Sequence, residues 1–191
     1  MRKIMMFTVR EEEKVAALAW AKSNEVEITF SNDILDMETV EHLKGFDGVT
    51  TQQMGKLDDN VYERLNQLGI KQIAQRTTGF DMYNLEKATE NNIIISNVPS
   101  YSPNSIAEYA VTSALQLVRK TNLIEQKVME KDFRWQMPIM AKEIKSLEIA
   151  VIGTGQIGQI AAKSFNGFGS KVVGYDLYPN EQAKQYLEYK E

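Results

Sequence analysis

Cysteine is absent from the sequence, and histidine occurs once, as His42. The lack of cysteine excludes disulfide bonds, thiolate catalysis and cysteine-based metal sites, and it fits a reducing compartment. Histidine is the usual proton acceptor near neutral pH, but His42 stands at the end of an early helical pattern, where a surface position is the better interpretation. We therefore expect no metal site and assign His42 no catalytic role.

Long apolar runs and clustered positive charge are also lacking. The apolar run near the start, from Ile4 to Phe7, is shorter than the roughly 7–15 apolar residues of a secretory signal. No segment approaches the ~20 apolar residues of a membrane span. The net charge of −4 argues against a nucleic-acid surface. We expect a cytoplasmic protein without membrane or nucleic-acid partners.

Short apolar runs alternate with helical patterns over the first hundred residues. Strands are predicted at 3–8, 25–30, 48–51, 72–75 and 93–96, and helices at 11–22, 36–43, 58–68 and 84–90. Strands that alternate with helices indicate βαβ units and a parallel sheet. The first part of the chain is therefore predicted to be an α/β domain over residues 1–103.

Pro99 and Pro103 interrupt this alternation, and a long helix is predicted to begin at Pro103. Ser105 and Glu108 match a capping box. The helix carries a wide apolar stripe, which is typical of a helix packed between two domains; its members are Ile106, Ala110, Val111, Ala114, Leu115, Leu117 and Val118. With a second amphipathic run at 123–131, residues 104–145 are predicted to be interdomain helices, followed by a second, partial domain at 146–191.

The second domain opens with a glycine motif, Gly153-Thr-Gly155-Gln-Ile-Gly158. An apolar strand at 147–152 precedes it, a helix at 156–168 follows, and a second strand at 171–175 ends at Asp176. This context is typical of dinucleotide-binding βαβ units, in which an acidic residue follows about 20 residues after the glycines. The first glycine permits a tight turn, the second lets the backbone approach a pyrophosphate, and the third lets helix and strand pack closely.

These features predict an NAD site. The amide groups at the start of the helix suit the phosphates, and Asp176 can accept hydrogen bonds from the ribose hydroxyls while its charge repels the 2′-phosphate of NADP. The predicted cofactor-binding residues are Gly153, Gly155, Gln156, Ile157, Gly158 and Asp176. The alternative is a purely structural glycine turn with an aspartate at a strand end.

Three segments in the observed order resemble the NAD-dependent D-isomer-specific 2-hydroxyacid dehydrogenases of the D-lactate dehydrogenase type. They are Gln75-Arg-Thr-Thr-Gly-Phe-Asp-Met-Tyr-Asn-Leu85, Ser96-Asn-Val-Pro-Ser-Tyr-Ser-Pro103 with Ile106-Ala-Glu108, and the glycine motif. The resemblance implies a flavodoxin-like substrate domain, discontinuous in sequence, with a Rossmann coenzyme domain inserted in it. The chain would then hold the flavodoxin-like domain followed by the first βαβ portion of the Rossmann domain.

The resemblance also implies a substrate site for a small 2-hydroxy or 2-keto acid, with pyruvate and D-lactate as the family's pair. Backbone amides at Thr78 and Gly79 would hold the carboxylate, and Tyr101 would line the pocket. The alternative interpretation is structural: Gly79 would be a turn residue between a strand and a helix, and Tyr101 a packing residue in a proline-stiffened loop. The family's catalytic arginine, glutamate and histidine follow the second Rossmann strand, so no catalytic residue is assigned, and Arg76 is given a structural role.

We therefore expect half of an active site and no turnover by this chain alone. The alternatives are a catalytically dead NAD-binding or partner-binding scaffold, and a shortened or interrupted gene product. Truncation would deprive several apolar side chains of their packing partners: Ile149, Val151, Ile157, Ile160, Phe165 and Val172. Relatives in this family are dimeric, and we expect a homodimer with contacts between about residues 104 and 176.

Overall fold

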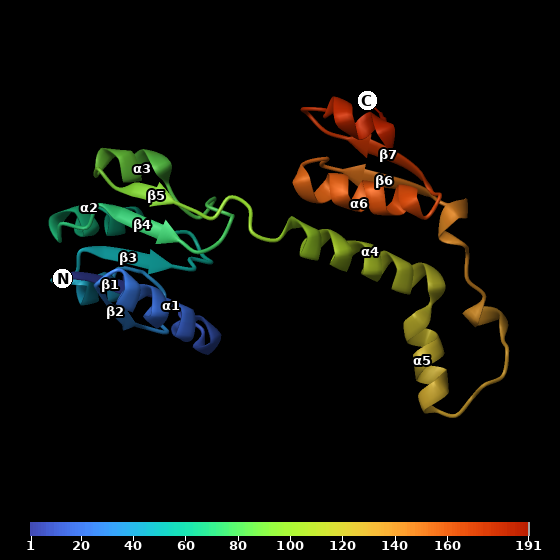
Figure 1. Cartoon of the computed structure of the whole chain (residues 1–191), viewed down its shortest axis with the longest axis horizontal. Coiled ribbons are helices and arrows are strands. Elements are labelled where there is room, and N and C mark those ends of the chain that lie inside the picture. Colours follow the sequence, from blue (N-terminus) through green and yellow to red (C-terminus); the bar gives the residue numbers. More distant parts are fainter. Residues whose placement is uncertain (191) are drawn as a thin grey trace. The chain divides into compact units, whose positions relative to one another are not determined.

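The computed structural model describes residues 1–190. The chain forms two compact units, the first spanning Met1–Tyr101 and the second beginning at Ser102 (Figure 1). No helix among the described residues is long and apolar enough to cross a membrane. Each unit contains its own parallel sheet and its own buried core.

The first unit is a five-stranded parallel sheet in the order β2-β1-β3-β4-β5. Its strands are β1 Arg2–Met6, β2 Val26–Phe30, β3 Gly48–Thr51, β4 Gln72–Gln75 and β5 Ile94–Ser96. The helical elements are α1 Glu11–Ser23, the 3-10 turn η1 Thr39–Leu43, α2 Asp59–Gln67 and α3 Leu85–Glu90. This strand order is that of flavodoxin-like folds, so the predicted fold class is confirmed.

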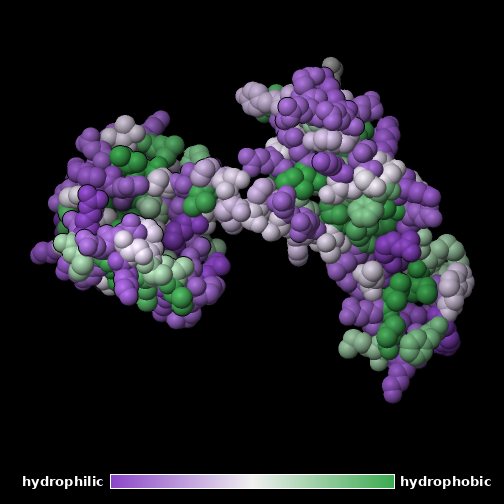
Figure 2. Space-filling view, viewed as in Figure 1, coloured by the Kyte–Doolittle hydropathy of each residue, from purple (hydrophilic) through white to green (hydrophobic). Residues whose placement is uncertain are grey.

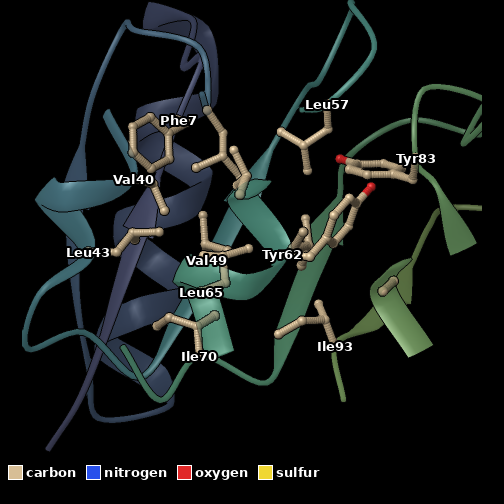
Figure 3. Close-up of a cluster of buried hydrophobic side chains, with 14 of the residues drawn as sticks. Phe7, Val40, Leu43, Val49, Leu57, Tyr62, Leu65, Ile70, Tyr83 and Ile93 are labelled. Atoms are coloured by element: carbon tan, nitrogen blue, oxygen red, sulfur yellow. The ribbon is translucent and has the colours of Figure 1, made fainter. Parts of the chain in front are cut away.

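The core of the first unit lies on one face of this sheet (Figure 3). Strand residues Met5, Val49 and Ile73 meet apolar side chains of η1, α2 and α3 there. Two buried tyrosines keep hydrogen bonds: the Tyr83 hydroxyl donates to Gln75 Oε1 at 2.6 Å, and Tyr62 Oη accepts from the Asn84 amide at 2.9 Å. Buried hydroxyls need such partners because an unpaired buried polar group is costly.

The helix predicted at 36–43 is wrong, because only Thr39–Leu43 is helical, as a 3-10 turn. Asp36 accounts for the difference. Its Oδ1 accepts from the amides of Glu38 and Thr39, both at 2.9 Å. Bonds to the amides two and three residues on are typical of a residue that precedes a helical turn, so Asp36 lies outside the helical segment.

The opposite face of this sheet carries an open apolar groove of about 680 Å³ beside α1. Helix α1 has one buried residue, Ala21, and leaves Trp20 half exposed. We call this the sheet groove; it is lined by Ile4, Met6, Ile28, Ala16, Ala17 and Trp20, among others. Parallel sheets are usually covered on both faces, so this face is less covered than is typical.

The second unit contains a smaller parallel sheet in the order β6-β7-β8. Its strands are β6 Glu148–Ile152, β7 Lys171–Tyr175 and β8 Glu188–Tyr189. The helical elements are α4 Pro103–Arg119, α5 Thr121–Met129, η2 Met137–Ile139, η3 Ile144–Ser146, α6 Gln156–Gly167 and η4 Glu181–Gln185. Helix α6 packs against the strands, and α4 packs along α6 (Figure 1).

One local prediction for this unit was wrong, and one strand was not predicted. The tail after Pro179 forms η4 and then β8, a third strand in which Tyr189 pairs with Gly174. Helix α4 is not capped by a box at Ser105. Its N-cap is Ser102, because Pro103 occupies the first turn with the fixed φ that suits helix initiation.

The apolar faces of the second unit are better covered than expected. Phe165 and Val172 are buried, while Ile149, Val151 and Ile160 pack against them. The covering comes from α4, which presents Ala107 and Val111, and from the tail, which presents Ala183 and Leu187. Of the six side chains expected to lose their partners, Ile157 is the one that is exposed, at 39%.

Candidate nucleotide-binding site

The turn between β6 and α6 depends on glycine. Gly153 has a φ of +86°, a left-handed conformation that glycine adopts at little cost. Its amide donates to the Tyr175 carbonyl at 2.8 Å. The turn is therefore fastened to the end of the neighbouring strand β7.

The other two glycines of the motif differ in their surroundings. A Cβ on Gly158 would lie 2.0 Å from the Gly153 carbonyl oxygen, so the first turn of α6 can approach the loop only without a side chain here. A Cβ on Gly155 would meet no atom within 4 Å. The backbone at Gly155 is thus open on the side from which a ligand would approach.

Helix α6 begins at this loop with an arrangement suited to an anion. Its N-cap is Gly155, which has no capping side chain, and its first turn holds no acidic residue. Gln156 and Ile157 occupy the first helical positions. The amide groups and the helix dipole at such an N-terminus favour phosphate.

Asp176 follows β7 and faces the same loop. Its Oδ2 accepts from the Thr154 amide at 2.5 Å and from Thr154 Oγ1 at 3.1 Å, and its Oδ1 accepts from the Tyr178 amide at 2.9 Å. The backbone hydrogen bonds from Tyr178 and Thr154 hold the pKa of the Asp176 carboxyl below its usual value. The side chain is therefore ionised at neutral pH.

Sequence reasoning missed the residues that surround Asp176. Thr154 is 2% exposed, and its hydroxyl lies 2.8 Å from Tyr189 Oη. Tyr189 Oη also accepts from the Asn180 amide at 3.0 Å. Thr154 occupies a variable position of the glycine motif, and Tyr189 lies in a strand of two residues, so neither position carries a signal in the sequence.

In the first unit, Thr78 and Gly79 lie in the exposed loop that follows β4. The segment after β5 is tied to this loop, because Asn97 Nδ2 donates to the Thr78 carbonyl at 2.7 Å. Open α/β sheets bind ligands beyond the carboxyl ends of their strands, which is where this loop lies. Tyr101, the last residue of the unit, is 68% exposed.

Arg76 and His42 are the two residues of this unit whose side chains were weighed as a carboxylate ligand and as a proton acceptor. Arg76 is engaged within the fold: its Nε lies 3.2 Å from Glu13 Oε1, and its Nη2 donates to the Thr8 carbonyl at 3.0 Å. His42 lies exposed on η1. Over residues 1–190, no group of three or more acidic or histidine side chains is placed to hold a metal ion.

Comparison with known proteins gives a consistent result. Residues 4–185 match the family model described as D-isomer specific 2-hydroxyacid dehydrogenase, catalytic domain. The chain is 54% identical over 191 residues to a D-lactate dehydrogenase of Staphylococcus epidermidis, covering all of this chain and 58% of that protein. It is 52% identical over 187 residues to one from Streptococcus agalactiae, covering 98% of this chain and 57% of the relative.

Solved structures agree with this result. A D-lactate dehydrogenase from Treponema pallidum superposes with a TM-score of 0.81 at 42% identity, over 99% of this chain and 57% of that chain. The Lactobacillus jensenii enzyme, described with NAD+, superposes with a TM-score of 0.80 at 34% identity, over 99% of this chain and 58% of that chain. The Aquifex aeolicus enzyme, complexed with NAD and lactic acid, superposes with a TM-score of 0.86 at 26% identity, over 98% of this chain and 55% of that chain. The chain thus spans somewhat more than half the length of these relatives.

Proposed function

The chain belongs to the D-isomer specific 2-hydroxyacid dehydrogenases, and we propose that it forms the N-terminal part of an NAD-dependent D-lactate dehydrogenase. The complete enzyme would reduce pyruvate with NADH to D-lactate and NAD. The observation that carries the proposal is the open glycine turn facing an ionised Asp176, in a chain 54% identical to a D-lactate dehydrogenase.

The second unit would hold the adenosine half of NAD. Gly153, Gly155 and Gly158 form the turn, and the amides of the first turn of α6 suit the pyrophosphate. Asp176 would bind the ribose, and its negative charge would disfavour the 2′-phosphate of NADP. When bound, NAD supplies the hydride acceptor and NADH the hydride donor.

The first unit would hold the substrate carboxylate through backbone amides of the Thr78-Gly79 loop. The bond from Asn97 to the Thr78 carbonyl supports this role because it fixes the loop before a ligand arrives. Tyr101, with most of its ring uncovered, would form part of the pocket wall. The substrate class is a small 2-keto or 2-hydroxy acid.

The 191-residue chain alone is proposed not to turn over substrate. Oxidation of a hydroxyl requires a group that accepts its proton, and His42 lies exposed on η1 within a different unit from the glycine turn. The reaction also needs a cation beside the substrate carboxylate, and Arg76 is already paired with Glu13. The catalytic residues of the complete enzyme would lie in sequence that its longer relatives possess.

A catalytically dead NAD-binding or partner-binding scaffold is the second candidate. The observation that favours it is the separation of the two roles: the predicted nucleotide site lies within this chain, whereas no catalytic residue is assigned in it. A shortened or interrupted gene product would share the same structural features. Sequence of the gene beyond the codon for Glu191 distinguishes this last case.

Calorimetry with NAD and NADP, combined with an assay of NADH oxidation by pyruvate, tests these proposals. We expect weak binding that prefers NAD, loss of that preference in Asp176→Asn, and no turnover. Equal affinity of the unaltered chain for the two nucleotides would remove Asp176 from its role. Turnover above the blank, in protein free of host dehydrogenase, would contradict the proposed inactivity.

A homodimer is proposed as the assembly. Apolar side chains gather on α5 and the segment after it, where Figure 2 shows exposed hydrophobic residues. They include Leu123, Ile124, Val128, Met129, Phe133, Trp135, Met137 and Met140, each at least 37% exposed. We call this set the α5 patch. Exposed apolar patches of this kind mark association surfaces, and this one falls within the region predicted for dimer contacts.

A further inference from the structure

The hydrogen bonds around Asp176 form a chain whose donors can be assigned. The Asn180 amide can only donate, so Tyr189 Oη accepts from it. Asp176 is ionised and can only accept, so the Thr154 hydroxyl donates to its Oδ2. The Thr154 hydrogen is thereby used, and the contact of 2.8 Å between Thr154 Oγ1 and Tyr189 Oη requires the tyrosine to donate.

The position of Thr154 is enforced by packing as well. A Cβ on Gly174 would lie 3.1 Å from Thr154 Cγ2 and 3.0 Å from Leu187 Cδ1. Gly174 pairs with Tyr189 across β7 and β8, so the short strand β8 brings the tyrosine to the threonine. The hydroxyl group of Tyr189 in β8 therefore connects the tail of the second unit to Thr154 in the glycine turn.

We infer that Tyr189, acting through the Thr154 hydroxyl, is a positioning residue that orients the Asp176 carboxylate for the ribose. This inference rests on the proposed NAD site. A carboxylate offers about four acceptor positions. Thr154 takes two on Oδ2 and the Tyr178 amide takes one on Oδ1, so the remaining position on Oδ1 receives one ribose hydroxyl instead of the two expected from the sequence.

Two pairs of variants test the role of this chain of hydrogen bonds. Thr154→Val removes the hydroxyl at nearly constant shape, whereas Thr154→Ser retains it. Tyr189→Phe removes the donor to Thr154, whereas Tyr186→Phe removes a hydroxyl that contacts Gln159 Oε1 at 3.2 Å instead. Thermal unfolding of each variant establishes that the second unit is folded.

The first measurement is the titration of the Asp176 carboxyl carbon by NMR, assigned with Asp176→Asn. We expect its pKa to rise in Thr154→Val, because a donor to the ionised form is lost. It should rise less in Tyr189→Phe, because the freed Thr154 hydroxyl can still reach the carboxylate. It should stay unchanged in Thr154→Ser and Tyr186→Phe. An unchanged titration in Tyr189→Phe overturns the inference, whatever the result for Thr154→Val.

The second measurement is NAD affinity. We expect about tenfold weaker binding in Thr154→Val and about threefold weaker binding in Tyr189→Phe. In an Asp176→Asn background, Tyr189→Phe should cause no further loss, since its effect passes through the carboxylate. An equal loss in both backgrounds contradicts the inference. If the unaltered chain binds no NAD, the proposed function fails, and the titration alone decides whether Tyr189 orients Asp176.

Discussion

At the scale of single residues, Gly155 and Gly158 give opposite expectations for the same substitution. Gly158→Ala should lower the free energy of unfolding of the second unit by about 2 kcal/mol, because the new Cβ would lie 2.0 Å from the Gly153 carbonyl oxygen. This loss should exceed the roughly 1 kcal/mol that alanine gains over glycine inside a helix. Denaturant unfolding followed by circular dichroism measures the change.

Gly155→Ala serves as the matched control within the same loop. Its Cβ would meet no protein atom within 4 Å, so stability should change by less than about 0.5 kcal/mol. NAD affinity should nevertheless fall, because the methyl group occupies the side open to the pyrophosphate. A stable Gly158→Ala variant, or a Gly155→Ala variant with unchanged affinity, would contradict the assigned geometry.

Glu13 supports a prediction on pH. Burial raises the pKa of its carboxyl, but hydrogen bonds from the Arg10 amide and from Arg76 outweigh that effect and leave the pKa below its usual value. A carboxyl whose pKa is lowered on folding stabilises the protein above the unfolded value of about 4.3, and this contribution is lost as the pH falls through the folded value.

Glu13→Gln should therefore destabilise the first unit by about 1 kcal/mol at pH 7. The difference from the unaltered chain should shrink as the pH falls below the unfolded value of about 4.3 and then through the lower folded pKa of Glu13, where the carboxyl becomes protonated. Glu12→Gln is the control, since Glu12 is exposed in the same helical turn. Chemical unfolding across pH 3–8 checks the prediction; a difference that persists at low pH would exclude the charge as its cause.

At the scale of elements, the contact between α4 and α6 depends on small side chains. Ala107 of α4 and Ala162 of α6 are completely buried in one core. Ala107→Leu should destabilise the second unit by about 1–3 kcal/mol through overpacking. Ala110→Leu, on the exposed side of the same helix, should change stability by less than about 0.5 kcal/mol. Equal effects on the two unfolding curves would mean that α4 does not pack as described.

Sequence patterns located most helices and strands, because their apolar periodicity and their flanking glycine or proline residues are visible in the sequence. Strands β3 and β4 begin and end at the predicted residues, and β5 begins one residue later than predicted. The segment predicted as a helix at 36–43 holds only the 3-10 turn Thr39–Leu43, because Asp36 bonds to the amides of Glu38 and Thr39 and precedes the helical segment. Strand β8 was missed because two residues give no alternation that a pattern could reveal.

The candidate site was predictable only where a motif requires a particular residue. The glycines follow from backbone geometry, and Gly153 and Gly158 have the conformation and the close approach that this geometry demands. Thr154 and Tyr189 contribute through side-chain contacts formed by distant parts of the sequence. Such contacts arise from tertiary packing, so the spacing of residues in a single sequence does not predict them.

At the scale of the whole molecule, the α5 patch predicts self-association. Light scattering at micromolar concentration should give about twice the 21.7 kDa of one chain. Phe133→Lys should shift the population toward the monomer, because Phe133 is 77% exposed within the patch. Met54→Lys, at an 83% exposed position of the first unit, should leave the assembly unchanged. A clean monomer of the unaltered chain at these concentrations would contradict the proposed dimer.

The second sheet has an open side at β6. Within residues 1–190, β6 has β7 as its strand partner, and Ile152 at its end is 83% exposed. Alternate amides of a strand point to opposite sides, so one set of β6 amides bonds to β7 and the other meets solvent. Hydrogen exchange should therefore divide β6 into fast and slow amides in strict alternation, while Val173 and Gly174 of β7, which pair with both β6 and β8, should exchange slowly. A polypeptide that adds a strand beside β6 would slow exchange of the solvent-facing amides. The slowed amides would identify which residues of β6 the added strand pairs with.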